Sequence, residues 1–155
     1  MQQICNLNEE ARVISLLSDL REQKSRGRIV VVATHVAPDA DAISSAALSA
    51  LALGGAELAF QSSDDSVSSE HPDTIGVDVR PGERSIKGRD SSAAEVIANA
   101  MKEMGWHFEQ PLNDLVSEVT AIDRGDSRRC ARLNLGRIVQ CLRAVGWDDV
   151  RIVRH

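Results

Sequence analysis

Aromatic residues are scarce in this 155-residue chain: they make up 3% of it, and tyrosine is absent. The apolar fraction of 43% and the charged fraction of 26% are nevertheless ordinary for a folded protein. A hydrophobic core therefore has to be built from alanine, valine, leucine and isoleucine. The length suits one domain, and we expect residues 1–155 to form a single globular unit.

Cysteine is also rare, and the three cysteines are Cys5, Cys130 and Cys141. Their odd number and wide separation match no metal-ligand spacing, so we expect free thiols in a reducing compartment. The N-terminal segment has acidic residues where a signal peptide needs a basic start and an apolar centre. No apolar run approaches the roughly 20 residues of a membrane span. The sequence therefore predicts a cytoplasmic protein without a membrane partner.

The chain also lacks an excess of positive charge: its formal net charge is -5 at pH 7. This balance argues against a general polyanion binder that is held by bulk charge. A local basic patch remains compatible with it. Any interaction with phosphate groups is therefore expected at a local site.

Hydrophobic periodicity predicts alternating helices and strands. Residues 28–34 form a continuous β-branched run, which is typical of a central strand covered on both faces. A capping box from Ser92 to Glu95 opens one of the helices. The expected helices are 9–26 after a cap at Asn8, 41–53, 92–104, 111–122 and 135–145. The expected strands are 28–34, 56–60, 74–79, a short one near residue 86 and an edge strand in 148–155, with a flexible surface loop at 61–73.

Strands that alternate with helices predict right-handed crossovers and an α/β fold. We expect a three-layer domain in which a mostly parallel sheet is flanked by helices. In open α/β sheets, ligands bind outside the carboxyl ends of the strands. Candidate functional residues should therefore follow the strands directly.

One histidine and four aspartates, all potential metal ligands, occur at or near such positions. His35, Asp39 and Asp41 follow the strand 28–34, Asp78 closes the strand 74–79, and Asp123 ends a helix. Hard divalent cations take carboxylate oxygens, and manganese, zinc and iron also accept imidazole. One histidine and four aspartates would suit one or two such ions, and a two-metal cluster activates water for attack on a phosphoryl group.

A structural explanation of the same residues stands beside this hypothesis. Asp39 or Asp41 would equally serve as the cap of the following helix, and His35 as a satisfied loop residue. Asp78 and Asp123, taken singly, are also typical of solvated turns. Spacing alone leaves both explanations open.

The stretch THVAPDADAISSAALSALAL resembles the first motif of the DHH phosphoesterase superfamily, which includes RecJ-type exonucleases, nanoRNases and family II inorganic pyrophosphatases. TIGVDV is similar to the second motif, SSAAEVIA to the helix after the third, and EVTAIDRGD to the fourth. The resemblance runs from about Ile29 to Asp126. It implies that His35 and Asp39 hold one manganese or similar ion, that Asp41 and Asp123 hold the other, and that Asp78 bridges them.

The chain departs from this family where the Asp-His-His triplet is expected. That position reads VRPGERSIKGRDSSAA, which contains no histidine, and His71 lies on the wrong side of the second motif. Lys87 has no lone pair for a metal at neutral pH, but its ammonium would supply one positive charge among the carboxylates. Further basic residues suit a phosphate or another anion, or are solvated loop charges: Arg84, Arg89, Arg124, Arg128, Arg129 and Arg132.

The second departure is that only about 29 residues follow Asp126, so we expect no C-terminal substrate-binding domain. A homodimer or a partner protein would then have to close the site against water. Two functions follow. One is a manganese-dependent phosphoesterase acting on a nucleotide or short oligonucleotide, using one or two ions. The other is a catalytically degenerate relative that keeps the fold, with one metal or none, and binds a nucleotide, an anion or a partner protein.

Overall fold

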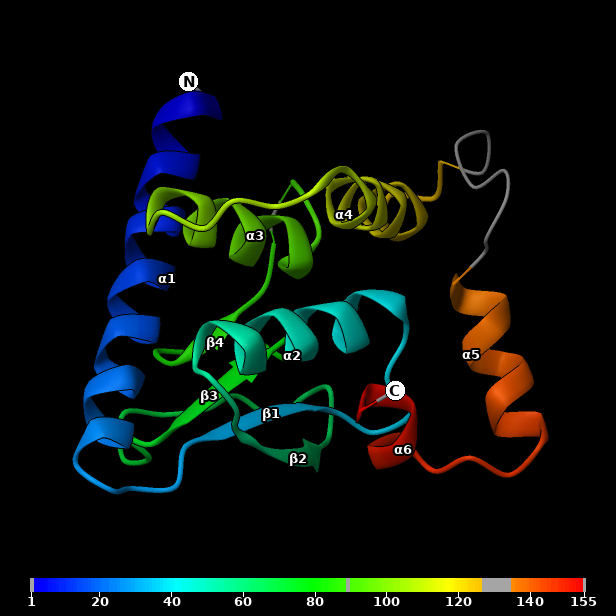
Figure 1. The fold of residues 1–155 in the computed structure, drawn as a ribbon, viewed down its shortest axis with the longest axis horizontal. Coiled ribbons are helices and arrows are strands. Elements are labelled where there is room, and N and C mark those ends of the chain that lie inside the picture. The colour runs from blue at the N-terminus through cyan, green and yellow to red at the C-terminus, as the bar shows by residue number, and fades with distance from the viewer. Residues whose placement is uncertain (1, 89, 127–134, 155) are drawn as a thin grey trace.

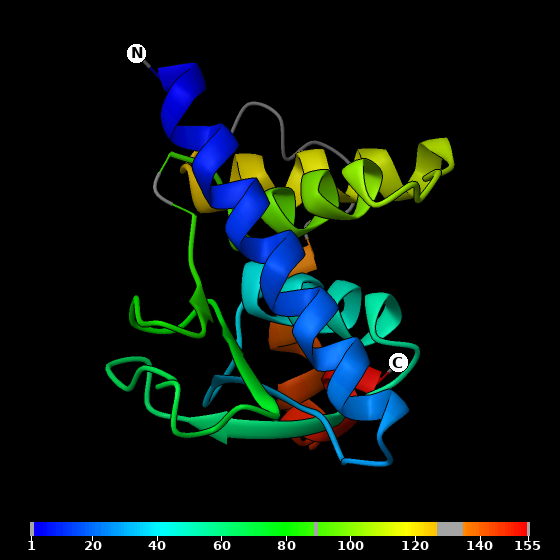
Figure 2. The same ribbon diagram turned by 90° about the vertical axis from the view of Figure 1, so that its left-hand side faces the viewer.

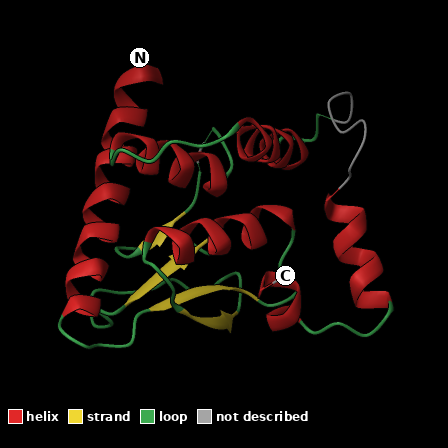
Figure 3. Cartoon of the chain, viewed as in Figure 1, coloured by secondary structure: helices red, strands yellow, loops and turns green. Residues whose placement is uncertain are grey.

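The computed structural model describes residues 2–88, 90–126 and 135–154 (Figure 1). Helices and strands alternate up to residue 61, two further strands follow up to residue 86, and the described elements after them are all helices (Figure 3). The elements are α1 (Gln2–Ser25), β1 (Val31–His35), α2 (Ala40–Ala52), β2 (Glu57–Gln61), β3 (Thr74–Val77), β4 (Ser85–Ile86), α3 (Ala93–Glu103), α4 (Gln110–Asp123), α5 (Leu135–Ala144) and α6 (Asp149–Arg154).

The four strands form one sheet in the order β2-β1-β3-β4, and every neighbouring pair is parallel. The expected α/β fold with a parallel sheet packed against helices is confirmed. The connections differ from the expected pattern, because only β1 and β2 are joined through a helix. The chain passes from β2 to β3 and from β3 to β4 through loops. All four strands still point the same way, so their carboxyl ends meet at one edge.

Helix α2 is the centre of the domain. It packs against β1 and β3 and also contacts α3, α4, α5 and α6. Figure 2 shows α2 between the sheet and the helices α3 and α4. Small side chains allow this close approach on several sides: ten of the 13 residues of α2 are buried, and seven of those ten are alanine or serine.

Helix α1 is tied to the C-terminal end of α2. The Lys24 Nζ donates to the carbonyls of Gly54 and Gly55, both at 2.6 Å, and the Arg21 Nε donates to the Ala52 carbonyl at 2.8 Å. These bonds satisfy carbonyls that have no partner within α2. None of the described helices, the 24-residue α1 included, is long and apolar enough to cross a membrane.

The face of the sheet opposite Ile75 and Val77 is covered by the loop between β2 and β3. Strand residues alternate between faces, so Gly76 points away from the core that holds its two neighbours. Val67 of the loop is 4% exposed, and a Cβ on Gly76 would lie 2.9 Å from its Cγ2. Residues 61–73 are therefore more than a surface loop, because Val67 is part of the buried interior.

Two expectations about the chain ends are wrong. Helix α1 begins at Gln2, so Asn8 lies within the helix and is not its cap. The expected C-terminal edge strand is the helix α6. Asp148 initiates it by accepting a bond from the Arg151 backbone nitrogen at 2.8 Å, and Ile152 is buried in the core.

Replacing Gly76 with alanine should destabilise the protein by about 1–3 kcal/mol, because the new Cβ would lie 2.7 Å from the Val79 Cγ2 and 2.9 Å from the Val67 Cγ2. Urea denaturation measures the change. The same substitution in a Val67→Ala background should cost less, because one of the two clashes is removed. Equal stability of Gly76→Ala and the wild type would contradict this packing.

Candidate metal centre

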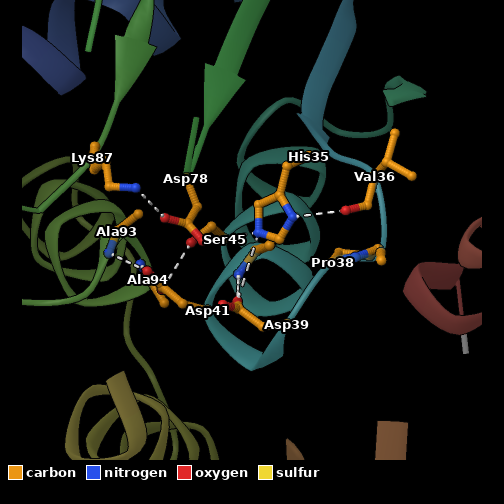
Figure 4. Close-up of polar contacts among 12 residues, drawn as sticks. His35, Val36, Pro38, Asp39, Asp41, Ser45, Asp78, Lys87, Ala93 and Ala94 are labelled. Carbon is orange, nitrogen blue, oxygen red and sulfur yellow. Dashed lines mark hydrogen bonds and ion pairs between the residues drawn. The ribbon is translucent and has the colours of Figure 1, made fainter. Parts of the chain in front are cut away.

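The register of the sheet places three candidate residues in one row. The partners nearest the carboxyl edge are Ala33 with Gly76 and Val77 with Ile86. Continuing the same pairing puts His35 beside Asp78 and Asp78 beside Lys87, each pair one strand spacing apart, about 4.8 Å. Figure 4 shows the three side chains together at the ends of their strands. The sheet therefore brings together residues that lie up to 52 positions apart.

The imidazole of His35 has a defined orientation. Its Nδ1 lies 3.0 Å from the backbone carbonyl of Val36, which can only accept, so Nδ1 carries the proton in this bond (Figure 4). In the neutral ring, Nε2 then presents its lone pair. That atom is 3.3 Å from the Asp78 Oδ2 and 4.0 Å from the Asp39 Oδ1. A backbone acceptor on one ring nitrogen is the usual support of a metal-binding histidine.

Asp78 lies between two cationic or potentially cationic groups. Its Oδ2 faces His35, and its Oδ1 lies 3.4 Å from the Lys87 Nζ. Burial raises the pKa of Asp78 and nearby Asp39 raises it further, whereas Lys87 and His35 lower it. The backbone of Asp78 has a φ of 51°, a conformation that costs energy in residues other than glycine and is enriched at functional sites.

Asp39 combines the two explanations that the sequence left open. Its Oδ1 caps α2 by accepting a bond from the Ala42 nitrogen at 3.0 Å, so the expected helix cap is confirmed. The side chain is 63% exposed and still faces His35. An ionised carboxylate has two oxygens and about four lone-pair positions, so capping and metal binding are compatible.

One nitrogen or oxygen atom from each of His35, Asp39 and Asp78 lies within 4.8 Å of the others. A cation with ligand bonds of about 2.1 Å holds neighbouring ligand atoms roughly 3.0–3.4 Å apart. The 3.3 Å between His35 and Asp78 already matches this spacing, and Asp39 is exposed and needs only a small rotation. The donor set of one imidazole and two carboxylates suits manganese, zinc or iron.

Asp41 has a different set of partners. Its Oδ2 accepts from the Ala93 nitrogen and its Oδ1 from the Ala94 nitrogen, both at 2.8 Å, and Ser45 donates to Oδ1 at 3.2 Å. Asp41 therefore holds the N-terminus of α3 from α2, where a carboxylate also complements the helix dipole. These bonds occupy both oxygens, which favours an anchoring role over metal binding.

A cavity of about 170 Å³ joins these residues. All five aspartates and histidines expected from the sequence line it, Asp123 included, together with Lys87 and three residues that sequence reasoning missed: Ser63, Gly88 and Ser91. Burial raises the pKa of Asp123 and nearby Asp39 adds to this, against Lys87 and Arg124. The glycine that follows Lys87 in the sequence was the available signal of a tight turn, and in the structure a Cβ at Gly88 would lie 1.8 Å from the Ser91 carbonyl oxygen.

Of the arginines expected around the cavity, the two that lie within the described residues have other partners. Arg84 donates from Nε to the Thr74 carbonyl at 2.9 Å, at the start of β3 and thus at the opposite end from Asp78. Arg124 bonds to the Asp90 carbonyl and pairs with Glu95 at 3.6 Å. The other arginines expected there lie outside the described residues: Arg89, Arg128, Arg129 and Arg132. Lys87 is the basic side chain that the described structure places at the cavity.

No protein-family model, curated protein or solved structure matches this chain. The site must therefore be interpreted from its own geometry. That geometry is a row across three parallel strands, a histidine with an oriented lone pair, and a lysine ammonium 3.4 Å from the Asp78 carboxylate.

The pH dependence of stability should report the burial of Asp41, whose pKa is raised by that burial to about 6 from an ordinary value of 3.8. Because the folded protein binds this proton more tightly than the unfolded chain, stability from this group is lost as the pH rises from about 4 through 6. The difference of about two pKa units corresponds to on the order of 3 kcal/mol.

Urea denaturation at pH 4 and pH 7 in a chelator, compared between the wild type and Asp41→Asn, measures this contribution. The wild type should gain stability relative to the variant at pH 4. A difference between the two proteins that does not change with pH would show that burial does not perturb this carboxyl group.

Proposed function

We propose that the protein is a metal-dependent phosphoesterase with a single divalent ion, manganese or a similar metal, held by His35, Asp39 and Asp78. The observation that carries the proposal is the orientation of His35. Its Nδ1 donates to the Val36 carbonyl, so its Nε2 lone pair points to the same space as two carboxylates. Such an ion would polarise a phosphoryl oxygen and lower the pKa of a bound water.

The position of Lys87 favours a site that holds one metal ion rather than two. Asp78 uses one oxygen towards His35 and the other towards the Lys87 ammonium, which is the arrangement of a bridging carboxylate with lysine in place of the second cation. Lys87 also lowers the pKa of both Asp78 and Asp123, so its charge is felt on both sides of the cavity. Its ammonium would bind the phosphoryl oxygens and stabilise the charge that develops on them.

The cavity favours a substrate with a terminal or accessible phosphoryl group. Its volume of about 170 Å³ and its lining by Ser63, Ser91 and Lys87 suit a phosphoryl group and leave little room for a nucleoside. The remainder of a nucleotide or short oligonucleotide would lie outside it. A second copy of the chain or another protein would then shield the reaction from water, as the sequence led us to expect.

The finer fold hypothesis belongs to the same proposal. Three features support a three-layer domain of the DHH phosphoesterase type. The sheet is parallel, helix α2 follows directly after His35, and Asp78 lies at the end of a strand. In that family the catalytic loop normally brings further histidines. We infer that Lys87 takes the place of those histidines, so the proposed enzyme would be a one-metal variant of the family chemistry.

A second candidate function is binding without catalysis. It is favoured by the ion pairs that Asp78 makes with His35 and Lys87, because each oxygen of its carboxylate has a partner within the protein. Such a cluster would bind a phosphate group or another anion through Lys87 alone. Binding of inorganic phosphate in a chelator, with no hydrolysis when manganese is added, would favour this candidate.

Hydrolysis of bis-(p-nitrophenyl) phosphate and of short oligonucleotides, with and without manganese, tests the enzyme directly. We expect metal-dependent turnover in the wild type. The turnover rate should fall at least 100-fold in Asp78→Asn, because the carboxylate would contact both the metal ion and the Lys87 ammonium. Asp19→Asn, on the exposed side of α1, is the matched control and should keep full activity. Absence of metal-dependent turnover in the wild type overturns the enzyme proposal.

Substitution of Lys87 should separate metal binding from catalysis. Lys87→Met removes a positive charge close to the metal position, so manganese should bind several-fold more tightly, whereas kcat should fall by on the order of 100-fold. Calorimetric titration gives the affinity and steady-state kinetics give kcat. Weaker manganese binding in Lys87→Met would mean that the ammonium is not near the ion.

A further inference from the structure

The loop between His35 and Asp39 has an unfavourable backbone conformation. Ala37 has a φ of 53°, which residues other than glycine seldom adopt. Ala37 also precedes Pro38, and a residue before proline prefers an extended backbone. This loop connects two of the three proposed ligands, so some interaction has to hold it in place.

Two residues of the C-terminal helices hold it. The Ala37 backbone nitrogen donates to the Asp149 Oδ2 at 2.9 Å, and the Arg143 Nη2 donates to the Pro38 carbonyl at 2.7 Å. Arg143 also pairs with the Asp149 Oδ1 at 3.2 Å. Arg143 lies in the last turn of α5 and Asp149 begins α6, and Figure 1 shows α6 beside the connection from β1 to α2.

We propose that Arg143 and Asp149 are positioning residues that fix the ligand loop, so that His35 and Asp39 converge on one ion. The contacts of this pair, which we call the Arg143–Asp149 clasp, are complementary in kind. The carboxylate meets the backbone donor of Ala37, and the guanidinium meets the backbone acceptor of Pro38. Neither side chain is more than 31% exposed, and this partial burial favours bonds to the loop over bonds to water.

The inference rests on the proposed metal site for its function, and the clasp itself is observable without metal. Hydrogen exchange at the Ala37 amide, followed by NMR in a chelator, reports the bond to Asp149. Manganese affinity, measured by calorimetric titration, reports the ligand geometry. Three variants separate these effects: Asp149→Ala, Asp149→Asn and Asp148→Ala.

Asp149→Ala should speed exchange at Ala37 by at least tenfold and weaken manganese binding 10- to 100-fold, the range for residues that orient metal ligands. Asp149→Asn keeps an oxygen acceptor and should retain most of both. Asp148→Ala removes the cap of α6 and does not touch the loop, so it should leave both readouts near the wild type. This control distinguishes positioning of the loop from general support by α6.

Unchanged Ala37 exchange in Asp149→Ala overturns the clasp, as does an equal effect of Asp148→Ala. Wild-type affinity for manganese in Asp149→Ala overturns its role in positioning the ligands. If the wild type itself binds no manganese, the proposed function fails, and the exchange at Ala37 alone then decides whether the clasp exists.

Discussion

The pairing register of β1, β3 and β4 is the constraint on which the site depends. It sets His35, Asp78 and Lys87 in one row at the carboxyl edge, so a shift of one residue would turn each side chain to the other face. Gly76 and Val67 constrain the packing of β3, because their close contact leaves no room for a side chain on the glycine. Packing within the sheet thus determines which side chains meet at its carboxyl edge.

Backbone conformations of positive φ flank this row. Among the described residues other than glycine, Ala37 and Asp78 have a positive φ, and both lie within the proposed site. Each is held by bonds from elsewhere: Asp78 donates from its nitrogen to the Ile86 carbonyl at 2.9 Å, and Ala37 donates to Asp149. The stability of the surrounding fold therefore maintains conformations that the local sequence disfavours.

The sequence predicted the parts of this arrangement that depend on local patterns. An apolar run followed by His35 and Asp39, and a second strand closed by Asp78, were enough to place these side chains at one edge of a parallel sheet. The partners of Asp41 could not be predicted, because its bonds reach Ala93 and Ala94 across two helices. The roles of α6 and Asp149 were missed for the same reason: the last residues suit a strand or a helix, and tertiary packing decides between them.

The charge balance of the cavity supports a bound cation. Four aspartates and one lysine line it, which gives -4 + 1 = -3 when all five are ionised and His35 is neutral. Burial raises the pKa of Asp41, Asp78 and Asp123, and neighbouring carboxylates raise each further, so the ionised cluster is unfavourable as it stands. Arg124 pairs with Glu95 and contributes only at a distance. A divalent ion beside Asp78 would relieve this repulsion while leaving the lysine to meet a phosphate, as the proposed one-metal site requires.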